Sequence, residues 1–290
     1  MTTTASPTEV VPVRAAAAAG ALLALTSLGG GGPAVAAVPR ASVVPCGAVL
    51  TADVRLAADV VCPGGPGIVL AADGVELNLN GHRLVGPGLR FGPTGVEVAA
   101  EGVVVRNGRI SGWGVGVSAG SEVDQPGEPR PVSGTVREVR LDGNRKGVEA
   151  RVAGDLAVRG SRLDGNGWGG SAYVGSRLLV ERSTVERNER GLHGFANADG
   201  GFAVRESLVR SNGTGIGCDQ DADVSVTGTT VQRNGTGLDV SQCSAVVEGS
   251  RFVWNARHVS AYLLEGDVLA VRCTSFTRDG GPVGVPLEPC

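Results

Sequence analysis

Several features are scarce or missing in this chain of 290 residues. Aromatic residues make up 3% of it, and Lys146 is the single lysine beside 25 arginines. The formal net charge is −3 and no basic stripe is visible along the sequence, which argues against a protein that binds nucleic acid. No apolar run reaches the roughly 20 residues that a membrane-spanning helix needs. We therefore expect neither a nucleic-acid partner nor a membrane span.

The amino terminus has the pattern of an export signal. Arg14 precedes the apolar run Ala15–Leu25, and the small residues Ala34–Ala37 follow a glycine-rich stretch. A charged start, a short apolar run and a small-residue cleavage site are typical of a signal peptide. The pattern predicts cleavage after Ala36 or Ala37, and hence a secreted, extracellular protein.

Cysteine pairs that could hold zinc are also missing, because the sequence contains no Cys-x-x-Cys. An even number of cysteines in an exported chain indicates disulfides. The pairing between sequence neighbours is one of about 15 that six cysteines allow. It would join Cys46 to Cys62, Cys218 to Cys243, and Cys273 to Cys290.

What the chain does contain is a repeat of about 22 residues. Asparagines mark it at positions 144, 166, 188, 212, 234 and 255, and Asp279 continues the series. Valine stands eight positions before each marker, an apolar residue stands three before, and serine or threonine stands five before in six of seven cases. Glycine follows three positions after the first five asparagines, and His258 takes that position after Asn255.

Such a period predicts an all-β solenoid. Each unit is too short to bury its own apolar face, so successive units must stack and align equivalent residues in columns. Asparagine and serine or threonine would then form ladders at corners, and each glycine would supply either a positive φ or a close backbone approach. The predicted organisation is an export signal at 1–37, an N-terminal cap and first coil at 38–74, the β-helix at 75–279 with a loop at 120–131, and a C-terminal cap at 280–290.

With these columns assembled, residues 46–290 resemble the secreted right-handed parallel β-helix proteins of the pectate-lyase-like superfamily. The opening carries the resemblance, with Cys46 and Cys62 around a cap and then a coil that ends in Leu79-Asn80-Gly81-His82. The resemblance implies a right-handed parallel β-helix and extracellular polysaccharide as the default substrate class.

Catalytic motifs of that superfamily are absent. The chain has no Arg-x-Pro-x-x-Arg of pectate lyases, no Asn-Thr-Asp set of polygalacturonases and no Asp-Pro-His-Asp of alginate epimerases. Gly-x-Ser-x-Gly around Ser118 and Gly-x-Gly-x-x-Gly at 165–170 do occur. Neither is followed by the helix that its chemistry requires, so we discard both.

One acidic group is a candidate site. Counted back from the asparagine ladder, Asp199 and Asp221 share a column, and Asp219 and Asp223 lie nearby. Two adjacent carboxylates could act as general acid and base on a glycosidic bond. Asp219, Asp221 and Asp223 could equally hold Ca²⁺, or all of them could be ordinary turn residues. The sequence therefore allows either no cofactor or calcium.

Two further features accompany this group. His193 should face solvent in a column with Glu149, Ser171 and Asp239, and it is a candidate for proton transfer. A second column, counted in the same way, gives a candidate substrate-binding strip of Arg151, Tyr173, Asn197 and Asp219.

The sequence thus predicts a secreted, monomeric β-helix protein that associates with extracellular polysaccharide. A non-enzymatic rod for structure or surface interaction is one alternative. The other is an enzyme, either a calcium-dependent polysaccharide lyase or a glycoside hydrolase.

Overall fold

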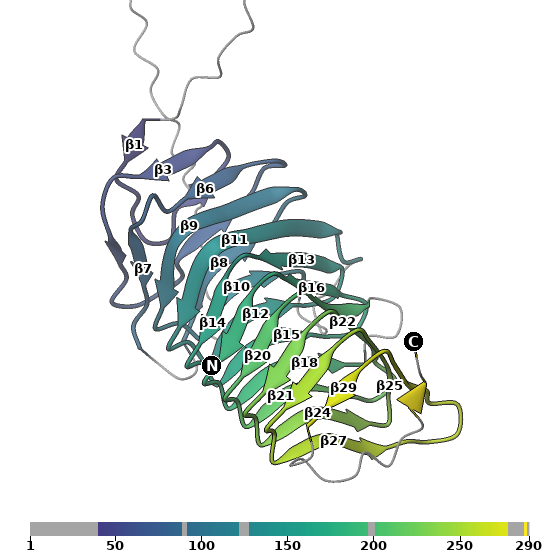
Figure 1. Cartoon of the computed structure of the whole chain (residues 1–290). Coiled ribbons are helices and arrows are strands. Elements are labelled where there is room, and N and C mark those ends of the chain that lie inside the picture. The colour runs from purple at the N-terminus through teal and green to yellow at the C-terminus, as the bar shows by residue number, and fades with distance from the viewer. Residues whose placement is uncertain (1–39, 89–91, 122–127, 197–200, 278–286, 289) are drawn as a thin grey trace, which may run out of the picture. The chain divides into compact units, whose positions relative to one another are not determined.

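The computed structural model describes residues 40–88, 92–121, 128–196, 201–277, 287–288 and 290. The predicted export signal lies outside these residues. All elements of the described part are strands, and nothing in it forms a helix that could cross a membrane. The strands stack in one continuous right-handed solenoid, coil upon coil (Figure 1). The predicted all-β parallel β-helix is therefore confirmed.

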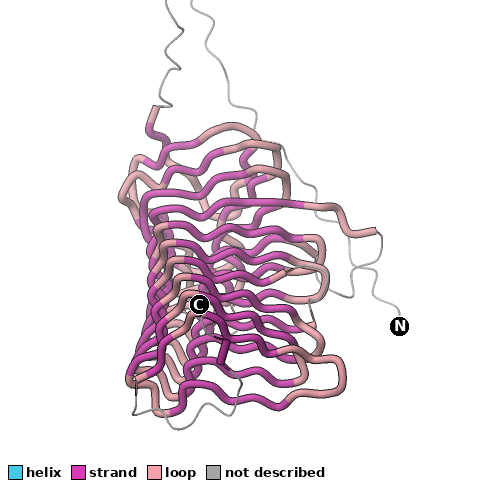
Figure 2. Tube along the Cα trace, turned by 45° about the vertical axis from the view of Figure 1, so that its right-hand side comes forward, coloured by secondary structure: helices cyan, strands magenta, loops and turns pink. Residues whose placement is uncertain are grey.

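Each complete coil contributes a strand to three faces, seen stacked edge to edge in Figure 2. Strands pair in parallel with the same face of the next coil. We name these faces I, II and III.

Face I consists of β1 (Ala41–Ser42), β3 (Val54–Leu56), β6 (Glu76–Asn78), β9 (Val103–Ser111), β11 (Val132–Asp142), β13 (Gly154–Arg159), β16 (Arg177–Glu181), β19 (Phe202–Arg205), β22 (Asp223–Thr227), β25 (Ser244–Glu248), β28 (Leu269–Arg272) and β30 (Leu287–Glu288). Face II consists of β4 (Val60–Val61), β7 (Arg83–Val85), the second halves of β9 and β11, β14 (Arg162–Asp164), β17 (Thr184–Glu186), β20 (Leu208–Arg210), β23 (Thr230–Gln232), β26 (Arg251–Val253) and β29 (Ser275–Phe276).

Face III is a separate ten-stranded sheet. It consists of β2 (Val49–Leu50), β5 (Ile68–Leu70), β8 (Thr94–Val98), β10 (Val115–Ala119), β12 (Lys146–Ala150), β15 (Trp168–Ala172), β18 (Arg190–Phe195), β21 (Thr214–Asp219), β24 (Thr236–Ser241) and β27 (Arg257–Tyr262).

The interior is built from the predicted apolar columns. Val136 pairs with Val158 and Val158 with Val180 on face I, while Leu141, Leu163 and Val185 follow one another on face II. All of these side chains are fully buried. Because strands 4.7–4.9 Å apart bring like side chains into contact, the column forms one dry core along the solenoid.

The asparagines form a ladder at the corner between faces II and III. The backbone N–H and Nδ2 of Asn166 both donate to Oδ1 of Asn188, at 2.9 and 3.1 Å, and the Nδ2 also donates to the Leu141 carbonyl. The pattern repeats from Asn144 to Asn255. Buried polar groups need partners, and the ladder provides them at every coil.

At each end of the ladder, a residue other than asparagine takes the next position. The N–H of Trp113 donates to Oδ1 of Asn144 at 3.0 Å, and its buried indole donates to the Leu84 carbonyl. At the other end, Nδ1 of His258 lies 3.2 Å from Nδ2 of Asn255, while Nε2 lies 2.9 Å from the Thr277 carbonyl oxygen. Since that carbonyl only accepts, Nε2 carries the proton and Nδ1 accepts from the asparagine.

Serine and threonine form the second predicted ladder, between faces I and II. The Ser183 hydroxyl accepts the backbone N–H of Ser161 at 3.1 Å and donates to the Glu181 carbonyl at 2.8 Å. The same pair of bonds recurs at Ser207, Thr229 and Ser250.

Of the two roles offered for the glycines that follow the asparagines, close approach is correct and positive φ is wrong. A Cβ on Gly191 would lie 2.2 Å from the Gly215 carbonyl oxygen, and the φ of Gly191 is not positive. Positive φ instead occurs just before the asparagine, at residues such as Arg187 and Ser211.

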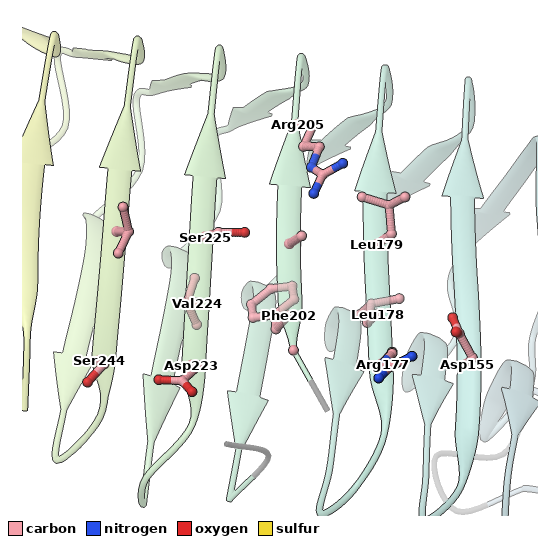
Figure 3. A pocket seen from close by; sticks show the side chains of 13 residues that line it. Asp155, Arg177, Leu178, Leu179, Phe202, Arg205, Asp223, Val224, Ser225 and Ser244 are labelled. Carbon is pink, nitrogen blue, oxygen red and sulfur yellow. The ribbon is translucent and has the colours of Figure 1, made fainter. Parts of the chain in front are cut away.

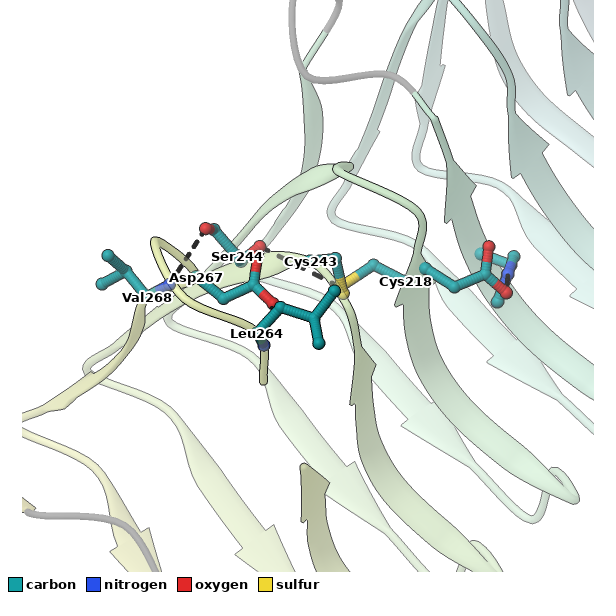
Figure 4. Close-up of a disulfide and its surroundings, with 8 residues drawn as sticks. Cys218, Cys243, Ser244, Leu264, Asp267 and Val268 are labelled. Atoms are coloured by element: carbon teal, nitrogen blue, oxygen red, sulfur yellow. Dashed lines mark hydrogen bonds and ion pairs between the residues drawn. A yellow bond between two sulfur atoms is a disulfide. The ribbon is translucent and has the colours of Figure 1, made fainter. Parts of the chain in front are cut away.

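Three disulfides join sequence neighbours, Cys46 to Cys62, Cys218 to Cys243 and Cys273 to Cys290. Of the open connectivities, the structure thus has the local one. Cys218 lies in an inward column of face III, and its bridge crosses to the turn that begins β25 (Figure 4). There Ser244 accepts the Val268 N–H at 3.1 Å, so the bridge anchors the turn that leads into the next coil.

Candidate functional site

The outward surface of face III carries an unusual group of polar and aromatic side chains. Its central column runs through Ser118, Glu149, Ser171, His193, Gly217 and Asp239, which pair with one another in register. The membership that the sequence predicted for this column is confirmed. In one flanking column Trp168 lies between Lys146 and Arg190. In the other, Phe195 lies beside Asp219.

Lys146 is the centre of one half of this group. Its Nζ forms an ion pair with Glu149 and donates a 3.0 Å hydrogen bond to the hydroxyl of Tyr173. Arg151 reaches the other oxygen of Glu149 at 2.8 Å. The Lys146 and Glu149 side chains are only 9% and 5% exposed. Two cations therefore contact one buried carboxylate in this half of the group.

Trp168 connects the two halves. The guanidinium of Arg190 lies 4.8 Å from its ring centroid, and Nζ of Lys146 lies 5.7 Å from it. The Trp168 ring also contacts the His193 imidazole edge-on, with 5.2 Å between the ring centroids. Tyr173 and Phe195 form a second aromatic pair, with 5.9 Å between their ring centroids. Such flat rings next to cations form a surface that suits a sugar ring bearing a carboxylate.

His193 and Asp219 form the second half. Nε2 of His193 lies 3.2 Å from Oδ2 of Asp219, and the imidazole occupies the space above Gly217, where a Cβ would come within 2.8 Å of Nδ1. Contrary to the expectation that it faces solvent, the His193 side chain is only 11% exposed. Burial lowers the pKa of His193, although the nearby Asp219 carboxylate opposes the shift. The imidazole is therefore neutral at neutral pH and able to accept a proton.

Two polar atoms in this group lack a hydrogen-bond partner within the described residues. They are Oγ of Ser171, which is 1% exposed and lies between Glu149 and His193 in the central column, and Oδ1 of Asp219. Buried polar atoms without partners are uncommon, so both are positions at which a ligand or water would be held.

A hollow of about 380 Å³ adjoins the group where β8, β10 and β12 meet. Its polar walls include Arg145, Lys146, Glu149 and Arg151. The aromatic and cationic surface thus continues into a recess lined by three cations and one carboxylate.

The protein-family model described as right handed beta helix region matches residues 94–276, well over half of the chain. The chain belongs to this β-helix family. A search of curated protein sequences finds no match.

Among solved structures, this β-helix protein is similar to the periplasmic alginate epimerase AlgG, with 15% identity and a TM-score of 0.54 over 78% of this chain. This chain spans 60% of the length of that epimerase. Pectate lyase Pel9A (12% identity, TM-score 0.40, 83% of this chain and 74% of that one) and the A-module of the mannuronan C-5 epimerase AlgE6 from Azotobacter vinelandii (16%, 0.38, 82% and 87%) are also similar. At these identities the likeness concerns the fold.

Of the residues that the sequence grouped together, the β-helix brings four to the outward surface of face III, namely Arg151, Tyr173, His193 and Asp219. Asn197 and Asp199 lie outside the described residues. The strip in which Asn197 stood beside Asp219 is wrong, because Phe195 pairs with Asp219 and takes that position after Arg151 and Tyr173. The two extra residues of this coil therefore follow β18 and do not precede it.

The three aspartates offered for calcium also point to different places. Asp219 ends β21 on face III, Asp221 lies in the turn with φ +61°, and Asp223 begins β22 on face I. Figure 3 shows Asp223 beside a shallow groove of about 520 Å³ on face I, together with Asp155 and Arg177. Among the residues with described positions, no three His, Cys, Asp or Glu side chains gather closely enough to hold a metal ion.

Sequence reasoning missed Lys146 as a site residue and left Glu149 and Trp168 without a role. Lys146, Glu149 and Arg151 stand two, five and seven positions after the ladder residue Asn144. The same three spacings after every ladder asparagine define the outward columns of face III, and they are the signal in the sequence that marks this site.

Proposed function

We propose that this protein binds an acidic extracellular polysaccharide along the outward surface of face III. The observation that carries the proposal is the cluster of Lys146, Arg151 and Arg190 around the rings of Trp168 and Tyr173. The three disulfides and the predicted export signal support a location outside the cytoplasm.

The chemistry of the surface favours a uronate over a neutral sugar. A sugar ring stacks on Trp168, and its carboxylate meets the cations that flank the ring. A neighbouring unit of the same polymer fills the recess beside Arg145 and Lys146, whose wall is cationic and polar. Neutral glycans would leave these cations without a new partner and should bind more weakly.

Binding can be tested by calorimetry with oligogalacturonides, oligomannuronides and neutral cello-oligosaccharides. Trp168→Ala should weaken binding of the acidic oligomers by about tenfold or more, since it removes the stacking ring and exposes the cations to water. Trp254→Ala is the matched control, because Trp254 is 53% exposed at the corner after face II and packs beside Arg233. Equal loss in the two variants, or no binding of any oligomer by the wild type, would refute the proposal and favour a structural rod.

One observation favours a second candidate, catalysis on the bound polymer. The neutral His193, oriented by Asp219, is able to accept a proton, and the Tyr173 hydroxyl held by Lys146 is able to donate one. His193 and Tyr173 both belong to the outward surface of face III.

This candidate is tested by product formation on acidic and neutral polysaccharides, with calcium and with chelator. Unsaturated ends would indicate a lyase, and new reducing ends without unsaturation would indicate a hydrolase. His193→Gln should then abolish turnover while leaving the affinity for oligomers within about threefold. Absence of product from the wild type would leave binding as the function of face III.

A further inference from the structure

The edge between faces I and II carries rows of arginine, one from each of several coils. The rows are formed by register, because equivalent residues of neighbouring coils pair directly. On the face I side the row is Arg106, Arg137 and Arg159, and on the face II side it is Arg109, Arg140 and Arg162.

Two open hollows lie on either side of this edge. One has a volume of about 540 Å³ and is lined by Arg137 and Arg159, and the other has about 460 Å³ and is lined by Arg140 and Arg162. Both hollows share Glu138, Gly160 and Arg182 in their walls. They therefore form one cationic groove around the edge, which we call the arginine edge.

The walls of the arginine edge carry more positive than negative charge. Five arginines line the two hollows, and Glu138 is the one carboxylate among the described residues of their walls. The five arginines form ion pairs with carboxylates outside the walls, namely Glu76, Asp142, Asp164, Glu181 and Glu186. The balanced composition of the sequence conceals this stripe, since its members lie in different coils.

The guanidiniums in the first hollow are open to a ligand. Arg137, Arg159 and Arg182 are 48%, 49% and 63% exposed. Their ion pairs are long, at 3.5 Å from Arg137 to Glu76 and 3.4 Å from both Arg159 and Arg182 to the same Glu181. A guanidinium has five N–H donors, so each retains several for an anion from outside.

We propose that the arginine edge is a second binding site, for a linear acidic polysaccharide that lies along the solenoid axis. Three successive coils carry an arginine at the same register position, at the interstrand spacing of about 4.8 Å, which suits a polymer with an anionic group on each unit. Carboxylates accept paired hydrogen bonds from arginine in this geometry.

Nucleic acid fits the arginine edge less well. Among the described residues, the walls of the two hollows include no aromatic side chain, whereas single strands are held by base stacking as well as by backbone charge. The site is also separate from face III and shares no residue with the surface proposed there. The inference therefore stands whether or not face III binds a glycan.

The test compares two triple variants of the full chain in binding to polygalacturonate over a series of salt concentrations. R137Q/R159Q/R182Q should weaken binding at low salt by about tenfold or more and flatten its salt dependence, because screened charge contacts are lost. R40Q/R130Q/R251Q removes the same charge from exposed positions outside the two hollows and should change affinity by less than about threefold. Unchanged thermal unfolding curves confirm that both variants fold.

Equal affinity of the two triple variants would overturn the proposal, and so would tighter binding of a single-stranded DNA oligonucleotide than of polygalacturonate. Trp168→Ala separates the two sites. With a real second site, the effect of the R137Q/R159Q/R182Q variant persists in the Trp168→Ala background. If the substitution at Trp168 alone abolishes all binding of the polymer, face III is the sole site and the arginine edge has no such role.

Discussion

The inward columns of this β-helix and the outward columns of its face III follow opposite rules. Inside, one residue type recurs in every coil, as asparagine does from Asn144 to Asn255. Outside on face III, the central column changes at each step, from Glu149 to Ser171, His193, Gly217 and Asp239. The comparison teaches that a column repeated in every coil holds the solenoid together, and that on face III the candidate site lies in a column that changes from coil to coil.

The physical reason is that a buried side-chain amide finds its partners only in adjacent coils and in the backbone beside it. Another asparagine provides both an acceptor and donors, so the same residue recurs. An outward side chain of face III does not need to match its equivalents in adjacent coils. Gly217 illustrates this freedom, because the missing side chain there makes room for the imidazole of His193.

The strongest test of this contrast is Asn188→Ala in the middle of the ladder. It leaves the N–H and Nδ2 of Asn166 without their acceptor and the Leu163 carbonyl without its donor. At roughly 1–3 kcal/mol for each buried group without a partner, we expect a loss of about 4 kcal/mol in the free energy of unfolding, measured with urea. Gln232→Ala removes an amide from an outward column of face II and should cost less than about 0.5 kcal/mol. Similar losses in the two variants would contradict the contrast.

A smaller effect is expected where the interior itself departs from repetition. Cys218 stands in an inward column whose other members include Ala172, Gly194 and Val240. C218A/C243A keeps the apolar character of the column and removes only a bridge that spans 25 residues. Stability should fall by about 3 kcal/mol, because the unfolded chain loses a constraint. A urea midpoint that matches the oxidised wild type would show that packing, not the bridge, holds this turn.

The smallest effect concerns acid and the outward surface. Burial holds the pKa of His193 below its ordinary value of 6.5, which applies to the unfolded chain. Between the two values the unfolded state binds more protons, so the contribution of His193 to stability falls as the pH decreases from about 6.5 toward the folded pKa. We expect less than about 1 kcal/mol. Urea unfolding at pH 7.5 and pH 5 should show a shallower acid loss for His193→Gln than for the wild type, and an equal loss would show that His193 is protonated alike in both states.

The fold could be predicted because inward columns repeat. Asn166, Asn188 and their equivalents, the valine column and the serine ladder all follow from the spacing of about 22 residues, and the structure has them in register. The site could be predicted only in part, since the outward columns of face III do not repeat. Glu149, His193 and Asp239 were aligned correctly, but no pattern singled out Lys146.

The error at Asn197 has a specific cause. The coil from Asn188 to Asn212 is two residues longer than its neighbours, and the sequence does not say where the extra residues lie. Counting back from Asn212 predicts that the two extra residues precede the strand that contains His193. Continuous pairing of β18 with β21 up to Phe195 and Asp219 places them after it, in the connection between strands, where insertions are tolerated best.

The asparagine ladder also has a direction. Every side-chain amide turns its oxygen toward the preceding coil and its N–H toward the next, so the row of dipoles points toward the C-terminal coil. Such a chain needs a donor at its start and an acceptor at its finish, and the N–H of Trp113 and Nδ1 of His258 supply them. A further coil of the same sequence pattern therefore fits anywhere between these two residues.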